Sequence, residues 1–80
     1  MSEGQPTADR EIDVRGLHCP YPLLAAKKAL ATMSAGEHLR VLATDPNAAK
    51  DFRLFAEASG NALVFAGGEA GALTFVFRRR

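Results

Sequence analysis

Two prolines stand two positions apart in the segment Cys19-Pro20-Tyr21-Pro22, directly before a run of apolar residues. Proline fixes its own φ and lacks a backbone N–H, so it suits the first turn of a helix and disrupts later turns. The segment therefore predicts a turn that leads into a helix beginning at about Pro22, with Gly36 as its C-cap. The apolar positions at helical spacing are Leu23, Ala26, Leu30 and Met33.

Alternating polar and apolar residues on either side of this helix predict strands over 10–14 and 38–44. In the second strand Leu39, Val41 and Ala43 should share one face. A second helix is expected from Asp45-Pro46 to about Ser59, because an acidic N-cap followed by proline is a strong helix start. Gly60-Asn61 should end it.

Two more strands are expected over 61–67 and 72–78, joined as a hairpin by a flexible loop over 67–71. Two helices cannot cover both faces of a four-stranded sheet. We therefore expect an α+β fold, a two-layer α/β sandwich of the order β-α-β-α-β-β. It should have a four-stranded mixed sheet with two helices on one face. The first two strands should run parallel through a right-handed crossover.

The other face of that sheet would then meet solvent or a partner. An exposed apolar strip there would indicate an interface, although scattered surface hydrophobes are an equally good interpretation. The candidates are Leu42, Val64 and Val76, with part of the set Phe65, Phe75 and Phe77.

The chain has 80 residues and a formal net charge of +1. We expect a single domain over 10–80 after a disordered N-terminal tail over 1–9. Direct nucleic-acid binding is not expected from this charge. The exception to this near-neutral charge is a local cluster of three arginines, Arg78–Arg80. It fits either a frayed solubilising tail or a contact for tRNA or an acidic partner. With one cysteine, no signal core and no apolar run of about 20 residues, a cytoplasmic protein without membrane insertion is predicted.

Cys19 should lie beside a helix N-terminus, where free N–H groups and partial positive charge favour an anion. This predicts a lowered thiol pKa and either a nucleophile or a holder of a sulfur-based anion. The alternative is a small buried hydrophobe, which its place between Gly16 and two prolines argues against. A single cysteine excludes a C-x-x-C redox cycle. His18 is adjacent to Cys19 in sequence and His38 is expected at the far end of the sheet, so no hydrolase triad is expected. One cysteine and two histidines without the usual ligand spacing do not predict a metal site.

The stretch DVRGLHCPYPLLAAKKAL resembles the signature of the TusA/SirA family of small sulfur-carrier proteins, and LRVLATDPNAAKDFRLFAEASGN is similar to the family's second half. The likeness covers residues 11–78 and implies the same sandwich, similar to the C-terminal domain of translation initiation factor three. The resemblance assigns the sulfur-carrying role to Cys19. The other residues of the family motif around this cysteine are Gly16, Leu17, Pro20 and Pro22.

The resemblance implies that Cys19 takes sulfane sulfur, as a persulfide, from a cysteine desulfurase or a rhodanese-like donor. The acceptor would be a DsrE/TusD-type or heterodisulfide-reductase-like protein, in tRNA 2-thiouridine synthesis or in sulfur-oxidation trafficking. No cofactor is implied beyond the covalent sulfur. The resemblance implies a sulfurtransferase-type carrier in a relay rather than a stand-alone enzyme.

Candidates for partner docking are Arg15, His18, Lys27 and Lys28, each of which also fits a plain solvated surface. Asp13 flanks the site with Arg15. A function of another class stays open, namely a regulatory or binding module that engages protein or nucleic acid through the open sheet face, with Cys19 structural. A narrower alternative is a paralogue for thiosulfate or selenium, which would use the same cysteine with a different donor.

Overall fold

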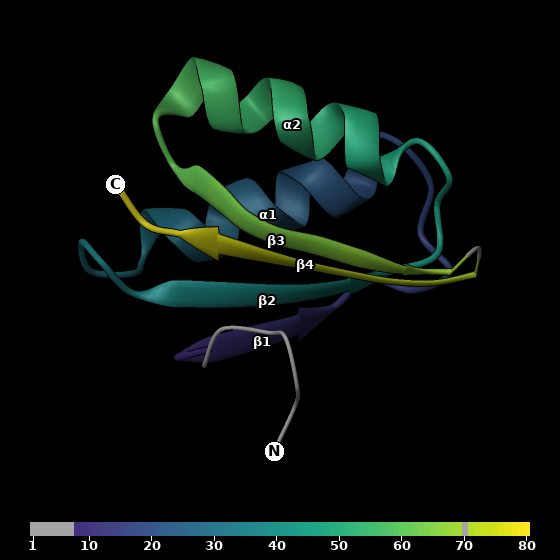
Figure 1. The fold of residues 1–80 in the computed structure, drawn as a ribbon, viewed down its shortest axis with the longest axis horizontal. Helices are drawn as coiled ribbons and strands as arrows, with labels where there is room; N and C mark the ends of the chain where they lie inside the picture. Colours follow the sequence, from purple (N-terminus) through teal and green to yellow (C-terminus); the bar gives the residue numbers. More distant parts are fainter. Residues whose placement is uncertain (1–7, 70) are drawn as a thin grey trace.

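The computed structural model describes residues 8–69 and 71–80. Its elements are β1 (Arg10–Asp13), α1 (Tyr21–Ala31), β2 (His38–Ala43), α2 (Ala48–Ser59), β3 (Ala62–Glu69) and β4 (Ala72–Arg78). Both helices lie on one face of the four-stranded sheet (Figure 1). The predicted α+β two-layer sandwich is confirmed.

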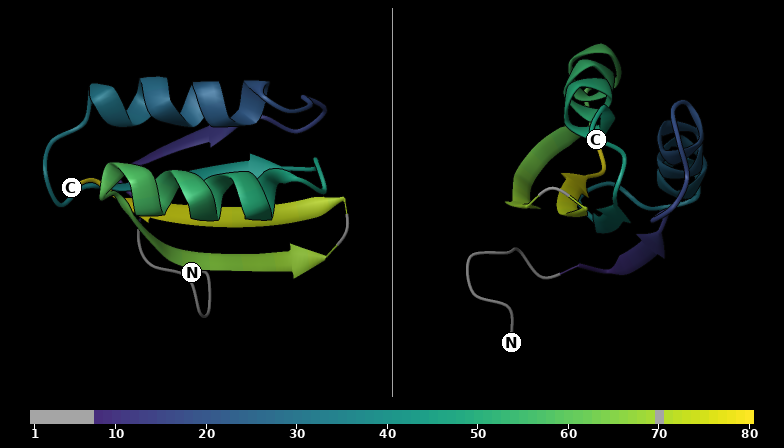
Figure 2. Two further views of the ribbon diagram at one scale, coloured as in Figure 1. Left: turned by 90° about the horizontal axis from the view of Figure 1, so that it is seen from above. Right: turned by 90° about the vertical axis from the view of Figure 1, so that its right-hand side faces the viewer.

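The strands are arranged in the order β1-β2-β4-β3. β1 pairs parallel with β2, as the crossover prediction requires, and β4 pairs antiparallel with both of its neighbours. Because parallel strands end at the same edge of a sheet, the loops that follow β1 and β2 are neighbours. Figure 2 shows the first turns of α1 and α2 at that same end of the molecule.

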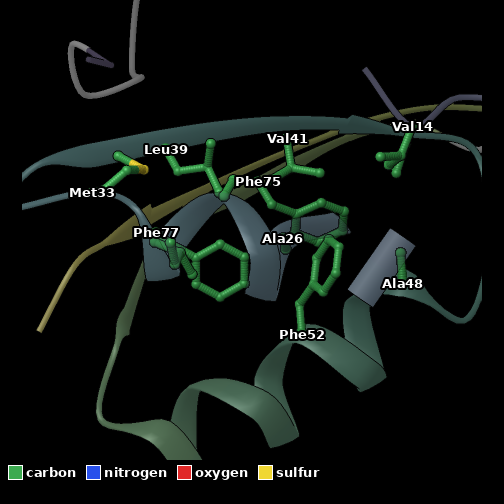
Figure 3. Packing of buried hydrophobic residues seen from close by; sticks show 12 residues of the cluster. Val14, Ala26, Met33, Leu39, Val41, Ala48, Phe52, Phe75 and Phe77 are labelled. Atoms are coloured by element: carbon green, nitrogen blue, oxygen red, sulfur yellow. The ribbon is translucent and has the colours of Figure 1, made fainter. Parts of the chain in front are cut away.

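The hydrophobic core lies between the sheet and the two helices (Figure 3). The predicted inward face of β2 is confirmed, since Leu39, Val41 and Ala43 are fully buried. Phe52 of α2 contacts two rings of β4 edge-on, with centroids 4.8 Å from Phe75 and 5.3 Å from Phe77. Edge-to-face geometry is a favoured aromatic arrangement, so this trio joins helix to sheet.

The open face of the sheet carries both apolar and charged side chains. Strand register places Val76 between Arg40 of β2 and Phe65 of β3. Val76 is fully buried there, in the middle of the sheet. Arg40 also pairs with Glu11 across the face at 3.2 Å. Phe75 and Phe77 face the helices instead, so of the three phenylalanines Phe65 alone turns outward, on the same face as Leu42 and Val76.

Three predicted boundaries are wrong. α1 ends at Ala31 with Thr32 as its C-cap, and Gly36 lies in the turn beyond it. α2 begins at Ala48 with Asn47 as N-cap, and Asp45 precedes the helix, with one carboxylate oxygen bound to the Asn47 N–H and the other to the Cys19 N–H. β3 runs to Glu69, so most of the expected flexible loop over 67–71 is paired with β4 instead.

The C-terminal arginines do not form a frayed tail. The guanidinium of Arg79 donates from Nε to the carbonyl of Leu30 at 2.8 Å. Arg80 donates from a terminal nitrogen to the carbonyl of Ser59 at 2.9 Å. The chain therefore ends by binding the C-terminal carbonyls of both helices. The predicted α2 end at Gly60 is confirmed, in the left-handed conformation.

At the other terminus, most of the expected disordered tail lies in residues 1–7, outside the described part of the chain. Asp9 is held against β2, because its N–H donates to the carbonyl of His38 at 2.8 Å. Among the helices of residues 8–69 and 71–80, none is long and apolar enough to cross a membrane.

Candidate functional site

Cys19 lies in the loop between β1 and α1, one residue before the N-cap of the helix, and its side chain is exposed. The loop closes onto the helix through hydrogen bonds from the Tyr21 N–H to the His18 carbonyl at 2.9 Å and from the Leu24 N–H to the Pro20 carbonyl at 3.0 Å. The peptide bond between Cys19 and Pro20 is cis. The loop therefore presents the thiol at the surface from a hydrogen-bonded backbone.

The motif residues around Cys19 have separate roles in this loop. Gly16 has a φ of +85°, which L side chains rarely adopt, and its N–H donates to Thr44 Oγ1 at 2.9 Å. Pro22, in the first turn of α1, is buried, whereas Pro20 is exposed. Leu17 is 43 % exposed, so it does not serve the core.

Asp45 is a site residue that the sequence reading treated only as a helix cap. The residue is buried, with 5 % of its surface exposed. Oδ2 accepts the Cys19 backbone N–H at 2.8 Å, and Oδ1 accepts the Asn47 N–H at 3.1 Å. A buried carboxylate needs such donors. Asp45 therefore ties the Cys19 loop to the turn that leads into α2.

The electrostatic surroundings of the thiol contradict the expected lowering of its pKa. The pKa of Cys19 is raised, chiefly by the interaction of the thiol with the Asp51 carboxylate, with further contributions from desolvation and from the charge of Asp45. Lys50 opposes them and lowers it. The prediction considered only the N-terminus of α1, whereas Asp51 of α2 and Asp45 in the turn before α2 also act on the thiol pKa.

The structure does not gather the four docking candidates into one surface. Arg15 is already paired with Asp13 through contacts of 2.9 and 2.7 Å, which hold the pKa of that carboxyl at about 2. Lys27 lies over the Phe55 ring, with Nζ 5.8 Å from the centroid, toward α2. Lys28 lines a groove on the β1 side of α1. Of the four, Arg15 and His18 share the loop with Cys19.

Exposed apolar side chains lie close to Cys19 in sequence, and the sequence reading did not single them out. Tyr21 is 61 % and Leu24 50 % exposed, and both follow Cys19 on the first turns of α1. Their spacing of three places them on one helix face, with Leu17 in the preceding loop. No cluster of three potential metal ligands occurs in the part of the chain that the structure describes.

A small two-layer α+β domain with one exposed cysteine at a strand-to-helix turn defines a class of thiol-bearing carrier. The sequence model of the sulfurtransferase TusA family matches residues 10–79. The chain is 46 % identical over 71 residues to the sulfur carrier protein TusA of Allochromatium vinosum, covering 89 % of this chain and 93 % of that protein. The chain belongs to the TusA family.

Two further relatives agree with this assignment. The sulfur carrier protein TusA of Pseudomonas syringae pv. syringae is 34 % identical over 74 residues, which are 92 % of this chain and 88 % of that protein. The crystal structure of a SirA-like protein from Desulfitobacterium hafniense is similar with a TM-score of 0.74 at 28 % identity. It covers 86 % of this chain and 95 % of that one.

Proposed function

We propose that this chain is a sulfur carrier that holds sulfane sulfur as a persulfide on Cys19 and passes it to a partner protein. The observation that carries the proposal is the single exposed thiol on a hydrogen-bonded loop, in a chain of the TusA family. A relay through a partner's cysteine needs one accessible sulfur and a surface to dock on. It does not need a catalytic triad.

The loading step is an exchange between sulfurs. The Cys19 thiolate attacks the terminal sulfur of the donor's persulfide, so an S–S bond forms on Cys19 while the donor's S–S bond breaks. The donor's cysteine leaves with the electron pair as a thiolate and takes up a proton from solvent, in place of the proton that Cys19 loses. One sulfur atom has moved without net oxidation or reduction, so the step needs no further reactant.

Unloading repeats the same exchange with the roles reversed, because the partner's thiolate then attacks the terminal sulfur on Cys19. A cysteine desulfurase or a rhodanese-like protein would be the donor, and a DsrE/TusD-type or heterodisulfide-reductase-like protein the acceptor. The persulfide sulfur is cargo and not a resident cofactor. We place the relay in the cytoplasm, where thiols stay reduced.

Two observations weigh against a nucleic-acid or sheet-face binding module. The side chains of Arg79 and Arg80 donate hydrogen bonds to carbonyl groups at the ends of the helices, and Arg79 also donates to the Arg80 carbonyl. The open sheet face carries the ion pair of Arg40 and Glu11 among its apolar side chains. Both features favour a role that uses the Cys19 end of the molecule.

The test is the intact mass of the protein after incubation with a cysteine desulfurase and cysteine, and separately with a rhodanese and thiosulfate. The expected result is a gain of one sulfur atom, removed by dithiothreitol and absent from Cys19→Ser. A chain that gains no sulfur from either donor, although Cys19 is alkylated by iodoacetamide, would contradict the proposal and favour a binding module.

A further inference from the structure

A cleft of about 310 Å³ lies between the C-terminal halves of α1 and α2, at the end of the molecule where the C-terminus lies (Figure 2). Small-molecule sites in proteins have volumes of about 300–1,000 Å³, so the cleft is large enough for a small ligand. Three cationic side chains line it, namely Lys27 of α1 with Arg79 and Arg80 after β4. No acidic side chain of the described residues lines it, so we call it the basic cleft.

The three cations of the basic cleft are not neutralised by acidic side chains. Within residues 8–69 and 71–80, none of them forms an ion pair with an Asp or Glu side chain. Lys27 instead lies over the Phe55 ring, with Nζ 5.8 Å from the centroid. Glu37 pairs its main chain with Arg79, but its carboxylate accepts the Ser34 N–H at 2.7 Å. Positive charge therefore prevails in the cleft, which favours an anionic ligand.

The two arginines are held in place by hydrogen bonds that leave some of their donors unused. Arg79 donates from Nε to the Leu30 carbonyl at 2.8 Å and from Nη1 to the Arg80 main-chain oxygen at 2.7 Å. Arg80 donates from Nη1 to the Ser59 carbonyl at 2.9 Å. A guanidinium has five N–H donors, and Nη2 of each side chain makes no hydrogen bond to the described residues. An anion would therefore meet donors that are already positioned, which lowers the cost of binding.

The walls of the basic cleft add an apolar surface to these charges, because Leu30 and Phe55 also line it. A phosphate monoester carries nearly two negative charges at neutral pH and three acceptor oxygens, which match several cations better than one carboxylate does. The apolar wall suits an organic group attached to that phosphate. Cations gathered in one cleft, rather than along a stripe, suit a small ligand better than a nucleic-acid backbone.

We propose that the basic cleft binds a small organic phosphate monoester. Its phosphate lies between Lys27, Arg79 and Arg80, and its organic group lies against Leu30 and Phe55. The ligand would join α1 to the segment that follows β4, so its binding should also stabilise the folded chain. This site is separate from Cys19, and the inference does not depend on sulfur transfer.

The test is a titration of the full chain with phenyl phosphate, followed through the backbone amide NMR shifts. Saturable shifts are expected in 27–31, 59–61 and 79–80. Benzoate has the same ring with a single charge and inorganic phosphate lacks the ring, so each should bind several-fold more weakly. Affinity for phenyl phosphate should rise as the pH passes about 6, where a phosphate monoester loses its second proton. No saturable shift at the cleft, or equal affinity for benzoate, would overturn the proposal.

A nucleic-acid backbone offers phosphate of a different kind, the singly charged diester. A short single-stranded oligonucleotide without terminal phosphates should therefore bind more weakly than phenyl phosphate. If it bound more tightly and shifted the same amides, the assignment of a small monoester would be wrong.

Lys27→Gln removes one cation from the cleft, and the Lys27 side chain makes no hydrogen bond within residues 8–69 and 71–80. Affinity for phenyl phosphate should fall several-fold. Lys28→Gln is the matched control, because it makes the same charge change on the neighbouring residue, which lines a groove on the β1 side of α1. Its affinity should stay close to that of the wild type. Equal losses in the two variants would show attraction by net charge alone and would overturn the site.

Arg80→Gln is a second variant, and its urea midpoint shows whether it folds like the wild type. Its affinity for phenyl phosphate should also fall several-fold, because it removes another cation from the cleft. If Lys27→Gln and the folded Arg80→Gln both bound phenyl phosphate with wild-type affinity, the phosphate would not lie between these cations and the proposal would be wrong.

Discussion

The guanidinium of Arg79 donates a hydrogen bond of 2.8 Å to the carbonyl of Leu30, which joins the end of the chain to the last turn of α1. Carbonyl groups at a helix C-terminus lack intrahelical partners and carry partial negative charge, so a cation is stabilising there. Arg80 makes the equivalent contact with Ser59 at the end of α2. The two arginines thus bind the C-terminal ends of both helices, and Figure 2 shows the C-terminus at the end of the molecule opposite the first turns of α1 and α2.

Arg79→Ala should lower the free energy of unfolding by about 1–2 kcal/mol, because it removes a part-buried charged hydrogen bond. Arg78→Ala is the control, since Arg78 is exposed on β4 and should change stability by less than about 0.5 kcal/mol. Urea denaturation followed by circular dichroism measures both. Equal effects of the two substitutions would show that Arg79 does not cap α1.

Much of the fold follows from local patterns. The alternation in β2 correctly predicted which side chains are buried, and the glycine at position 60 correctly predicted the end of α2. The paired prolines correctly placed Cys19 at a strand-to-helix turn. These signals involve residues within a few positions of one another, which is where propensity and periodicity are informative.

The surroundings of the thiol could not be read in the same way. Asp45 followed by Pro46 has a complete local explanation as a helix start, so nothing near it in sequence indicates a contact with Cys19. The available signal was topological, because a parallel β1–β2 pair brings the loops after both strands together. With that contact assigned, the charges of Asp45 and of Asp51 in the first turn of α2 would have been considered, and a lowered pKa would not have been predicted.

Asp45→Ala should destabilise the fold by about 1–3 kcal/mol, since it leaves the N–H groups of Cys19 and Asn47 without their acceptor. It should also slow sulfur loading, because the loop that presents Cys19 is released. Asp45→Asn keeps one carbonyl oxygen and should recover part of both losses. The measurements are urea denaturation and the rate of mass gain with a donor. If Asp45→Ala gained sulfur at the wild-type rate, the hydrogen bond from the Cys19 N–H to Asp45 would not be what positions the cysteine.

Phe52→Ala should cost about 3–5 kcal/mol, because the ring is fully buried between two rings of β4 and its removal leaves a cavity. A small domain has a total stability of only about 5–15 kcal/mol, so this variant should unfold at much lower urea. Leu54→Ala, on the exposed side of the same helix, is the control and should change the midpoint little. If Phe52→Ala retained the wild-type midpoint, the Phe52 cluster would not be the main contact between α2 and the sheet.

The ion pair of Asp13 and Arg15 predicts a pH dependence in the acid range. Arg15 lowers the pKa of Asp13 from 3.8 to about 2. The largest cause is the side-chain hydrogen bond from Arg15, and the next is the hydrogen bond from the Arg15 backbone N–H. Because the folded-state pKa lies below the unfolded one, any stabilisation is complete above pH 3.8 and is lost as the pH falls toward 2. Both side chains are about half exposed, so solvent screens the pair and a small effect on stability is expected.

Arg15→Ala should therefore return the pKa of Asp13 toward 3.8 and flatten the stability profile between that pH and 2. The direct measurement is the chemical shift of the Asp13 carboxyl carbon as a function of pH. Arg53→Ala, which removes an exposed cation on α2, is the control and should leave that titration unchanged.

Because the Arg15 side chain is paired with Asp13, sulfur loading of Cys19 by a small persulfide should also proceed at the wild-type rate in Arg15→Ala. A slower rate only with a protein donor would then assign Arg15 to docking as well as to the ion pair.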